Sequence, residues 1–290
     1  MRFLDIMQPM SASPLLGYVR TASLAARQAG RLLAQHVGRP SSVATKSGIN
    51  DLVTEIDHAS EQMIHRILHR AYPDFGFLGE EHGRRRTASA YRWLVDPLDG
   101  TTNFVHGVPC FGVSIGLEHN GTLIAGVIFD PIRQQLFTAA RGHGTFLNGK
   151  RLHVSRHRTL ASSLLSTGFS ANFRRHPQPY VRWFHTLESR SQAVRRIGST
   201  ALSLAYIAAG WLDGFYEREL WPWDIAAGLL LVEEAGGRVT NFQGNSVVLA
   251  EGRMVASNGW IHREMLRVIQ GGARRVSVGA KARSRAGGGS

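Results

Sequence analysis

The spacing of apolar residues changes along the chain from a helical period to a strand period, and this order constrains the fold more than any other feature. Between Leu15 and Val37, apolar side chains recur every three or four residues, as they do in an amphipathic helix. We expect a second helix after Thr54, whose side chain can cap it together with Asp57 three residues further on. Two helices therefore precede any clear strand.

The middle of the chain is rich in predicted strands, and turn residues separate them. The expected strands are Arg92–Val95, Cys110–Glu118, Leu123–Phe129, Gln135–Ala139 and Leu152–Val154. Asn120 with Gly121, and Asn148 with Gly149, are typical of tight hairpin turns. The order predicts an antiparallel meander.

Helical patterns return after about residue 160. We expect helices at Ser199–Ala209 and Ile225–Ala235, strands at Gly214–Glu217 and Arg253–Ala256, and a final helix at Trp260–Ile269. This order predicts an α/β chain of the α+β type, with helices and sheets packed in layers.

The same pattern divides the chain into four parts. We expect an N-terminal extension at 1–14, an α+β half at 15–155, an α/β half at 156–271 and a disordered basic tail at 272–290. The tail consists mainly of Gly, Ala, Ser and Arg, and it has too little apolar content to offset its ordering entropy.

Composition narrows the class of protein. The chain has 290 residues, of which 43% are hydrophobic, enough to bury a sizeable core. No apolar run approaches the roughly 20 residues that cross a bilayer, and the first ten residues do not resemble a signal peptide. We therefore expect a cytoplasmic protein with no membrane partner.

Cys110 is the single cysteine, so an intramolecular disulfide is excluded. Because Cys110 lies in an apolar stretch, we expect a buried strand thiol rather than a reactive one.

The formal net charge is +13, and basic residues gather in three places. These are Arg84 to Arg86, the stretch 174–196 and the tail. A solvated basic face would explain such clusters, as would attraction of an anionic substrate or weak nucleic-acid binding. No aromatic RNA-binding motif or zinc finger accompanies the charge, so charge alone is weak support for a nucleic-acid partner.

Residues 93–104, Trp-Leu-Val-Asp-Pro-Leu-Asp-Gly-Thr-Thr-Asn-Phe, join an apolar strand to two carboxylates three residues apart. Pro97 biases Asp96 toward an extended backbone, and Gly100 permits the close approach that a phosphate needs. The amides from Gly100 onward could open a helix and donate to phosphate oxygens. An ordinary turn built on Asp-Pro and Asp-Gly pairs is the alternative for this segment alone.

Two more acidic positions extend this pattern. Glu80 follows the apolar stretch Phe-Gly-Phe-Leu, and Asp224 follows Trp-Pro-Trp at the start of an Ala/Gly-rich helix. Taken singly, Glu80 could be a surface acid and Asp224 a helix cap. Together with Asp96 and Asp99 they form a set of hard oxygen ligands without His or Cys, which suits Mg2+ rather than Zn2+ and also fits Mn2+. Two or three such ions could hold the attacking and leaving oxygens of a phosphoryl transfer.

These motifs resemble those of the inositol monophosphatase family, in the lithium-sensitive Mg2+-dependent phosphatase superfamily, and in particular its bacterial extragenic-suppressor type. The matching stretches, over roughly residues 15–270, are Asp51 to Thr54 with Asp57, Gly79 to Glu81, Asp96 to Phe104, Arg195 to Ala201, and Trp223 to Gly228.

The resemblance implies a layered αβαβα sandwich, a homodimer and lithium-sensitive hydrolysis of a small phosphomonoester such as myo-inositol 1-phosphate. By position, it implies that the metal ligands are Glu80, Asp96, the backbone carbonyl of Leu98, Asp99 and Asp224. Asp51 and Thr101 match the catalytic pair that orients the attacking water and helps to deprotonate it.

Substrate contacts follow from the same resemblance. The matching positions are Asp99, Gly100, Thr101, Arg195, Ala201, Glu217 and Asp224. Glu217 could instead be a rim acid paired with Arg218, and Arg195 could equally serve a dimer interface or nucleic acid.

The substrate stays open, because members of the superfamily act on fructose 1,6-bisphosphate, adenosine 3',5'-bisphosphate or histidinol phosphate with the same ligand set. An accessory role in binding RNA or a transcription complex is a further hypothesis, motivated by the net charge.

Overall fold

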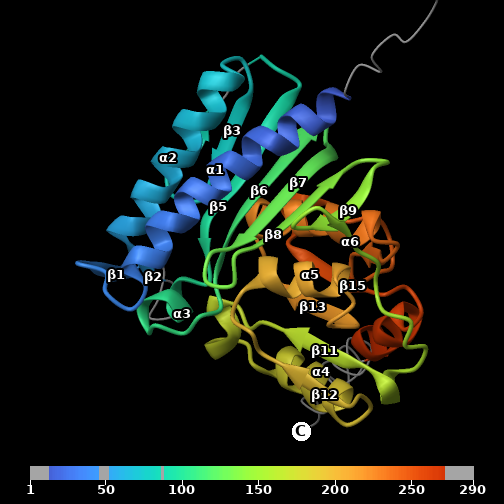
Figure 1. Ribbon diagram of the computed structural model, residues 1–290. Helices are drawn as coiled ribbons and strands as arrows, with labels where there is room; N and C mark the ends of the chain where they lie inside the picture. Colours follow the sequence, from blue (N-terminus) through green and yellow to red (C-terminus); the bar gives the residue numbers. More distant parts are fainter. Residues whose placement is uncertain (1–12, 46–51, 86–87, 272–290) are drawn as a thin grey trace, which may run out of the picture.

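Two β-sheets form the body of the protein (Figure 1). The computed structural model describes residues 13–45, 52–85 and 88–271, so the predicted tail and nearly all of the predicted extension lie outside the described residues. The large sheet has eight strands, in spatial order β10 (Lys150–Arg151), β9 (Gly144–Leu147), β8 (Gln135–Ala140), β7 (Thr122–Asp130), β6 (Gly112–His119), β5 (Tyr91–Asp99), β3 (Gly76–Gly79) and β4 (Gly83–Arg85). The small sheet has five, in the order β12 (Ala193–Arg195), β11 (Leu164–Thr167), β13 (Gly214–Arg218), β15 (Arg253–Ser257) and β14 (Arg238–Thr240).

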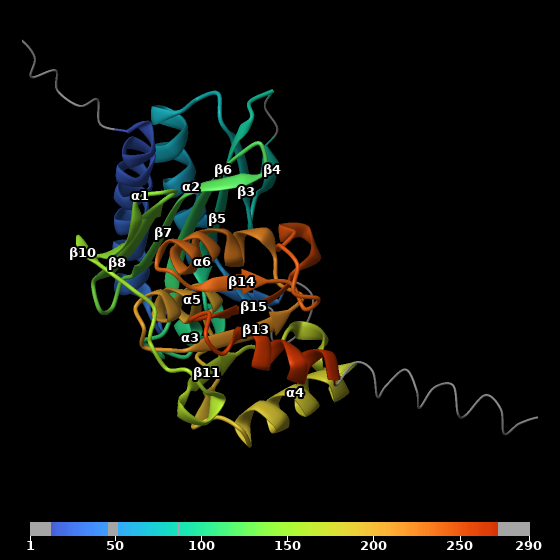
Figure 2. The ribbon, with the colours of Figure 1, turned by 90° about the vertical axis from the view of Figure 1, so that its right-hand side faces the viewer.

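Helices cover these sheets in layers. Their bounds are α1 (Pro14–His36), α2 (Glu55–Ala71), α3 (Thr101–Val105), α4 (Gln178–Glu188), α5 (Thr200–Ala208), α6 (Pro222–Glu234) and a final helix at 262–271. The pair α1 and α2 packs on one face of the large sheet, and α5 with α6 lies between the two sheets (Figure 2). Trp183 of α4 and Met265 of the final helix pack with Tyr216 and Val255 of the small sheet. The predicted αβαβα sandwich is therefore confirmed.

The start of α2 follows the predicted cap. Thr54 ends the short strand β2 (Leu52–Thr54), which pairs with β1 (Val43–Thr45). Its hydroxyl accepts from the amide of Asp57, and Asp57 Oδ2 accepts from the Thr54 amide at 2.8 Å. This reciprocal pair satisfies two amides that a helix N-terminus would otherwise leave unpaired.

Helix α6 is apolar on every side because sheets enclose it from two directions. Two glycines of the large sheet allow it to approach closely. A Cβ at Gly116 would lie 2.7 Å from Ala226, and one at Gly126 would lie 2.8 Å from the carbonyl of Ala227. This close packing fixes the N-terminus of α6 beside the large sheet.

Several elements differ from the sequence prediction. Leu152–Val154 is not a strand, because this segment leaves the large sheet and its Leu and Val side chains pack on the core shared with α6. Strand β5 is longer than Arg92–Val95, because its pairing with β6 resumes after an irregularity and continues to Asp99. Cys110 precedes β6 and is only partly buried, so its predicted place in a strand was wrong. Helix α4 and strands β11, β12 and β14 were not predicted.

Candidate active site

The two carboxylates of the β5 segment lie at the end of a strand that is buried from Trp93 onward. Asp96 and Asp99 have only 3% and 9% of their surface exposed. The pairing of β5 with β6 shifts between these two residues, because Pro97 has no amide to donate. The irregularity leaves the Leu98 amide free to donate to Asp96 Oδ1 at 3.0 Å.

Glu80 reaches the same place from the neighbouring strand. Strand β3 runs parallel to β5, with Gly79 opposite Val95, so the carboxyl ends of both strands lie at one edge of the large sheet. The Glu80 amide donates to the carbonyl of Val95 at 3.2 Å. Glu80 therefore lies directly beside Asp96.

Asp99 joins the large sheet to α5. Its carboxylate accepts from the Ser199 hydroxyl, from the Ala201 amide at 2.7 Å and from the Thr200 amide at 3.2 Å. Burial raises the pKa of Asp99 to about 6, although these hydrogen bonds act to lower it. The N-terminus of α5 thus orients this carboxylate.

Asp224 comes from the first turn of α6, as predicted. Its Oδ2 accepts from the Trp221 amide at 2.8 Å. Asp224 keeps partial exposure through the cavity that it lines, yet the surrounding protein raises its pKa well above the ordinary value, and Glu80 adds to this rise. Among the causes, desolvation is the largest.

These carboxylates line one cavity of about 780 Å³. Its floor includes Glu80, Asp96, Leu98, Asp99, Gly100, Thr101, Glu217 and Asp224. Desolvation raises the pKa of Asp96 well above its usual range, and the charges of Glu80, Asp99 and Asp224 raise it further. Such a concentration of buried negative charge is stable only when protons or cations neutralise it.

Thr101 has a partner that the sequence did not predict. Its hydroxyl lies 3.3 Å from Asp57 Oδ1 and 3.1 Å from the carbonyl of Leu98. The predicted partner, Asp51, lies outside the described residues. In the sequence, Asp57 was identified as a helix cap and as part of a family motif, but not as a partner of Thr101; it is 1% exposed and serves both the cap and Thr101.

Glu217 of β13 faces the cavity from the small sheet. It is 8% exposed, and the Thr200 hydroxyl donates to its Oε2 at 3.3 Å. Burial raises its pKa to about 8, and the nearby Asp99 contributes to the rise. The alternative pairing with Arg218 is not present, because Arg218 forms its ion pair with Glu219 at 3.1 Å.

Two predicted substrate contacts do not line the cavity. Ala201 is fully buried and contributes its amide to Asp99 rather than a side chain to the cavity wall. Arg195 is exposed at the end of β12 and is absent from the cavity lining. The structure therefore brings together Gly100, Thr101 and the acidic set, and leaves Arg195 outside.

The structure adds an aromatic and polar rim that sequence reasoning missed. The rings of Trp221 and Trp223 stack with centroids 5.4 Å apart and planes 9° apart, and Trp221 is 63% exposed. Ser170 donates to Glu219, and both line the same cavity. Trp221 and Trp223, which lie just before Asp224 in the sequence, could have indicated the aromatic rim. No sequence pattern indicated the role of Ser170.

The donor set fits a hard divalent cation. All the acidic side chains offer oxygen, and the Leu98 carbonyl lines the same cavity. Within the described ranges, no three His, Cys, Asp or Glu side chains are already arranged closely enough to hold an ion. The chemistry of the site therefore matches Mg2+, although the carboxylates do not yet converge on one point.

Comparison with known proteins identifies the class. The sequence model of the inositol monophosphatase family matches residues 17–271. The Nus factor SuhB of Pseudomonas aeruginosa is 43% identical over 272 residues, which is 91% of this chain and 97% of that protein. The inositol-1-monophosphatase of Mesorhizobium japonicum is 42% identical over 263 residues, with 90% and 98% covered.

A solved structure agrees with these sequence matches. The crystal structure of the extragenic suppressor protein suhB from Bartonella henselae superposes with a TM-score of 0.84 at 40% identity, covering 87% of this chain and 98% of that one. Fold, cavity and sequence together define a phosphatase of the layered α/β class. Within that class, the chain belongs to the inositol monophosphatase family.

No helix in the part of the chain that the structure describes is long and apolar enough to cross a bilayer.

Proposed function

We propose that this protein is a Mg2+-dependent phosphatase that hydrolyses myo-inositol 1-phosphate to inositol and phosphate. One observation carries the proposal: the nearly inaccessible Asp96 shares its cavity with Glu80, Asp99 and Asp224, and all three raise its pKa. Clustered buried carboxylates lower the stability of the folded protein because their charges repel one another. Bound divalent cations would offset this repulsion, so the cluster favours a cation-binding site.

The residues that would hold the ions are Glu80, Asp96, the Leu98 carbonyl, Asp99 and Asp224. When bound there, Mg2+ supplies positive charge that favours deprotonation of the attacking water and offsets negative charge on the phosphate. Mn2+ offers the same chemistry with the same oxygen ligands.

Side chains of this protein can orient the attacking water and accept the proton that it loses. Thr101 lies at the cavity floor, and its hydroxyl is held by Asp57 and by the Leu98 carbonyl. A threonine hydroxyl fixed in this way can accept a hydrogen bond from water while its own proton points to a carboxylate. We propose that Asp51 shares this task with Asp57.

The cavity also offers groups for the rest of the substrate. Glu217 and Thr200 present a carboxyl group and a hydroxyl that can bind the hydroxyls of a polyol. The exposed face of Trp221 can cover the apolar face of a ring. These groups support a cyclic polyol phosphate more than a linear substrate.

The test is phosphate release from myo-inositol 1-phosphate, with and without Mg2+, beside fructose 1,6-bisphosphate, adenosine 3',5'-bisphosphate and histidinol phosphate. We expect Mg2+-dependent release that is fastest for the inositol ester and that LiCl inhibits. Faster turnover of one of the other three esters would show that this ester, and not the inositol ester, is the preferred substrate.

A second candidate function is accessory binding to RNA or a transcription complex. It is favoured by the similarity to proteins named Nus factor SuhB from Pseudomonas aeruginosa and Escherichia coli, and by the net charge of +13. It predicts salt-sensitive RNA binding that persists in Asp96→Asn, whereas phosphatase activity would be lost.

We further propose that the protein works in the cytoplasm as a homodimer. Light scattering coupled to size-exclusion chromatography would give about twice the mass of the 31.9 kDa chain. A monomeric mass across the working concentration range would contradict the dimer.

A further inference from the structure

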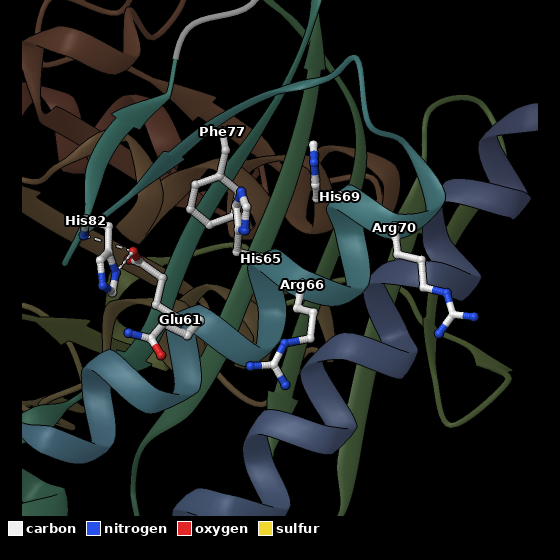
Figure 3. A pocket seen from close by; sticks show the side chains of 8 residues that line it. Glu61, His65, Arg66, His69, Arg70, Phe77 and His82 are labelled. Carbon is white, nitrogen blue, oxygen red and sulfur yellow. Dashed lines mark hydrogen bonds and ion pairs between the residues drawn. The ribbon is translucent and has the colours of Figure 1, made fainter.

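A second pocket lies on the outer side of α2, and its lining shares no residue with the acidic cavity. Its volume is about 420 Å³, and it is lined by Glu61, Gln62, His65, Arg66, His69, Arg70, Phe77 and His82. Figure 3 shows this lining from close by: the side chains of α2 project from successive turns, and Phe77 and His82 come from β3 and the turn after it. We call it the α2 pocket.

The buried carboxylate of the α2 pocket is already satisfied. Glu61 is 1% exposed, and it accepts from the amides of Glu81 and His82 at 2.8 and 2.9 Å. Its Oε1 also lies 2.7 Å from Nδ1 of His82. Glu81 next to it pairs with His58 at 3.8 Å. These contacts fix the turn after β3 against α2 and offset the negative charge beneath the pocket.

The positive groups of the α2 pocket are not offset in this way. Arg66 and Arg70 lie one turn apart on the exposed side of α2. Among the described residues, neither guanidinium has a carboxylate partner within ion-pair distance. The two arginines therefore present a row of donors toward solvent, about 6 Å apart along the helix axis.

Aromatic rings form the other side of the pocket. The imidazoles of His65 and His69 stack with centroids 5.4 Å apart, and the Phe77 ring meets His65 edge-on at 4.9 Å. Figure 3 shows these three rings beside one another, with Arg66 and Arg70 on the adjacent row of the same helix. Stacked imidazoles and an edge-on phenyl ring, next to two guanidiniums on the same helix, are suited to an organic phosphate.

We propose that the α2 pocket binds the phosphate chain of a small polyphosphate, either a nucleoside triphosphate or an inorganic polyphosphate. Two non-adjacent phosphate groups of one chain can each accept a bidentate hydrogen-bond pair from one of the two arginines. The pocket volume admits a ligand of nucleotide size, and the stacked imidazoles of His65 and His69 offer a surface for a base.

Calorimetric titration of the full-length protein with tripolyphosphate, and separately with adenosine triphosphate, tests this proposal. Metal-depleted buffer and the Asp96→Asn variant keep the acidic cavity from binding phosphate through Mg2+, so the result does not depend on phosphatase function. The test variant is Arg66→Gln/Arg70→Gln. Its matched control is Arg263→Gln/Arg267→Gln, which removes two exposed arginines with the same spacing from the final helix.

We expect one site for both ligands, equal in wild type and Asp96→Asn, and weakened about tenfold or more in the Arg66→Gln/Arg70→Gln variant but not in its control. Tighter binding of adenosine triphosphate than of tripolyphosphate would show that the aromatic rings contact the base, and equal binding would show that the phosphate chain suffices. The proposal fails if neither ligand binds, or if both double variants weaken binding equally. Thermal melting of each variant confirms that it folds.

Discussion

Asp96 is a single residue whose burial lowers the stability of the folded protein in the absence of cations. Its side chain is almost inaccessible, and three neighbouring carboxylates act on it. The hydrogen bond from the Leu98 amide compensates only part of the cost of burying a charge. In the absence of a cation, the folded protein is therefore strained electrostatically at this point.

This strain predicts the effect of Asp96→Asn on stability. The amide keeps an oxygen for the Leu98 amide but removes one buried negative charge, so the melting temperature in metal-depleted buffer should rise. Added Mg2+ should raise the melting temperature of wild type more than that of the variant. Asp74→Asn, at an exposed acid outside the cavity, is the control and should change neither value. A lower melting temperature of metal-depleted Asp96→Asn would contradict this account.

At the scale of an element, the turn between β5 and α3 depends on one glycine. Gly100 has φ of 102°, and a Cβ there would lie 3.0 Å from the carbonyl oxygen of Cys110 and 3.1 Å from that of Gly198. Both neighbours are backbone atoms, which cannot rotate away. The turn thus requires glycine for its backbone angle and for space.

We expect Gly100→Ala to lower the free energy of unfolding by at least ~2 kcal/mol, because backbone strain and the two contacts add. Phosphatase activity should fall as well, since Thr101 follows directly. Gly121→Ala is a matched control, with φ of 77° and open space around the added Cβ. Its cost should be about 1 kcal/mol, with activity unchanged. Equal losses in the two variants would show that crowding at Gly100 has no effect.

The final helix meets the small sheet at a buried histidine. His262 is 1% exposed, and its ring nitrogens lie 2.8 Å from the Thr240 hydroxyl and 2.9 Å from the Ser257 hydroxyl. Burial lowers its pKa to about 4, and the charge of Arg238 acts in the same direction. The folded protein therefore holds this imidazole neutral under conditions in which the unfolded chain protonates it.

The sign of the pH effect follows from this difference. Between pH 6.5 and about 4 the unfolded chain binds one more proton at this position, so the free energy of unfolding falls as the pH falls, by about 3 kcal/mol in total. Urea titrations across this range should show a shallower fall for His262→Gln than for wild type. His176→Gln, at an exposed histidine, should retain the wild-type slope. Identical slopes for wild type and His262→Gln would disprove the assignment.

The sequence predicted elements with a strong local pattern and missed contacts that depend on tertiary packing. The capping box at Thr54 and the carboxylates at the end of β5 were visible because each is encoded within a few residues. The contact of Asp57 with Thr101 joins residues 44 positions apart, and that of Ser170 with Glu219 joins residues 49 apart. Helix α4 lies against β12 and forms part of the small-sheet core, but it was not predicted from the sequence.

At the scale of the whole molecule, an acidic cavity lies in a chain with a net charge of +13. The basic surface should attract a phosphorylated substrate toward a site that would repel it without bound cations. At saturating Mg2+, we expect kcat/KM to fall as the KCl concentration rises above about 0.1 M, because the screening length then drops below about 10 Å. A neutral ester such as p-nitrophenyl acetate would not report this effect, so a phosphomonoester is required. A kcat/KM that does not change with salt would exclude electrostatic steering.

The central claim is that the acidic cavity hydrolyses phosphomonoesters with the help of bound cations. Its most direct test is the rate of phosphate release from myo-inositol 1-phosphate as Mg2+ is titrated into wild type and Asp96→Asn. The account predicts a saturable, Mg2+-dependent rate in wild type and a loss of at least about a hundredfold in the variant. Undiminished release by Asp96→Asn, or release by wild type that is independent of divalent cations, would contradict it.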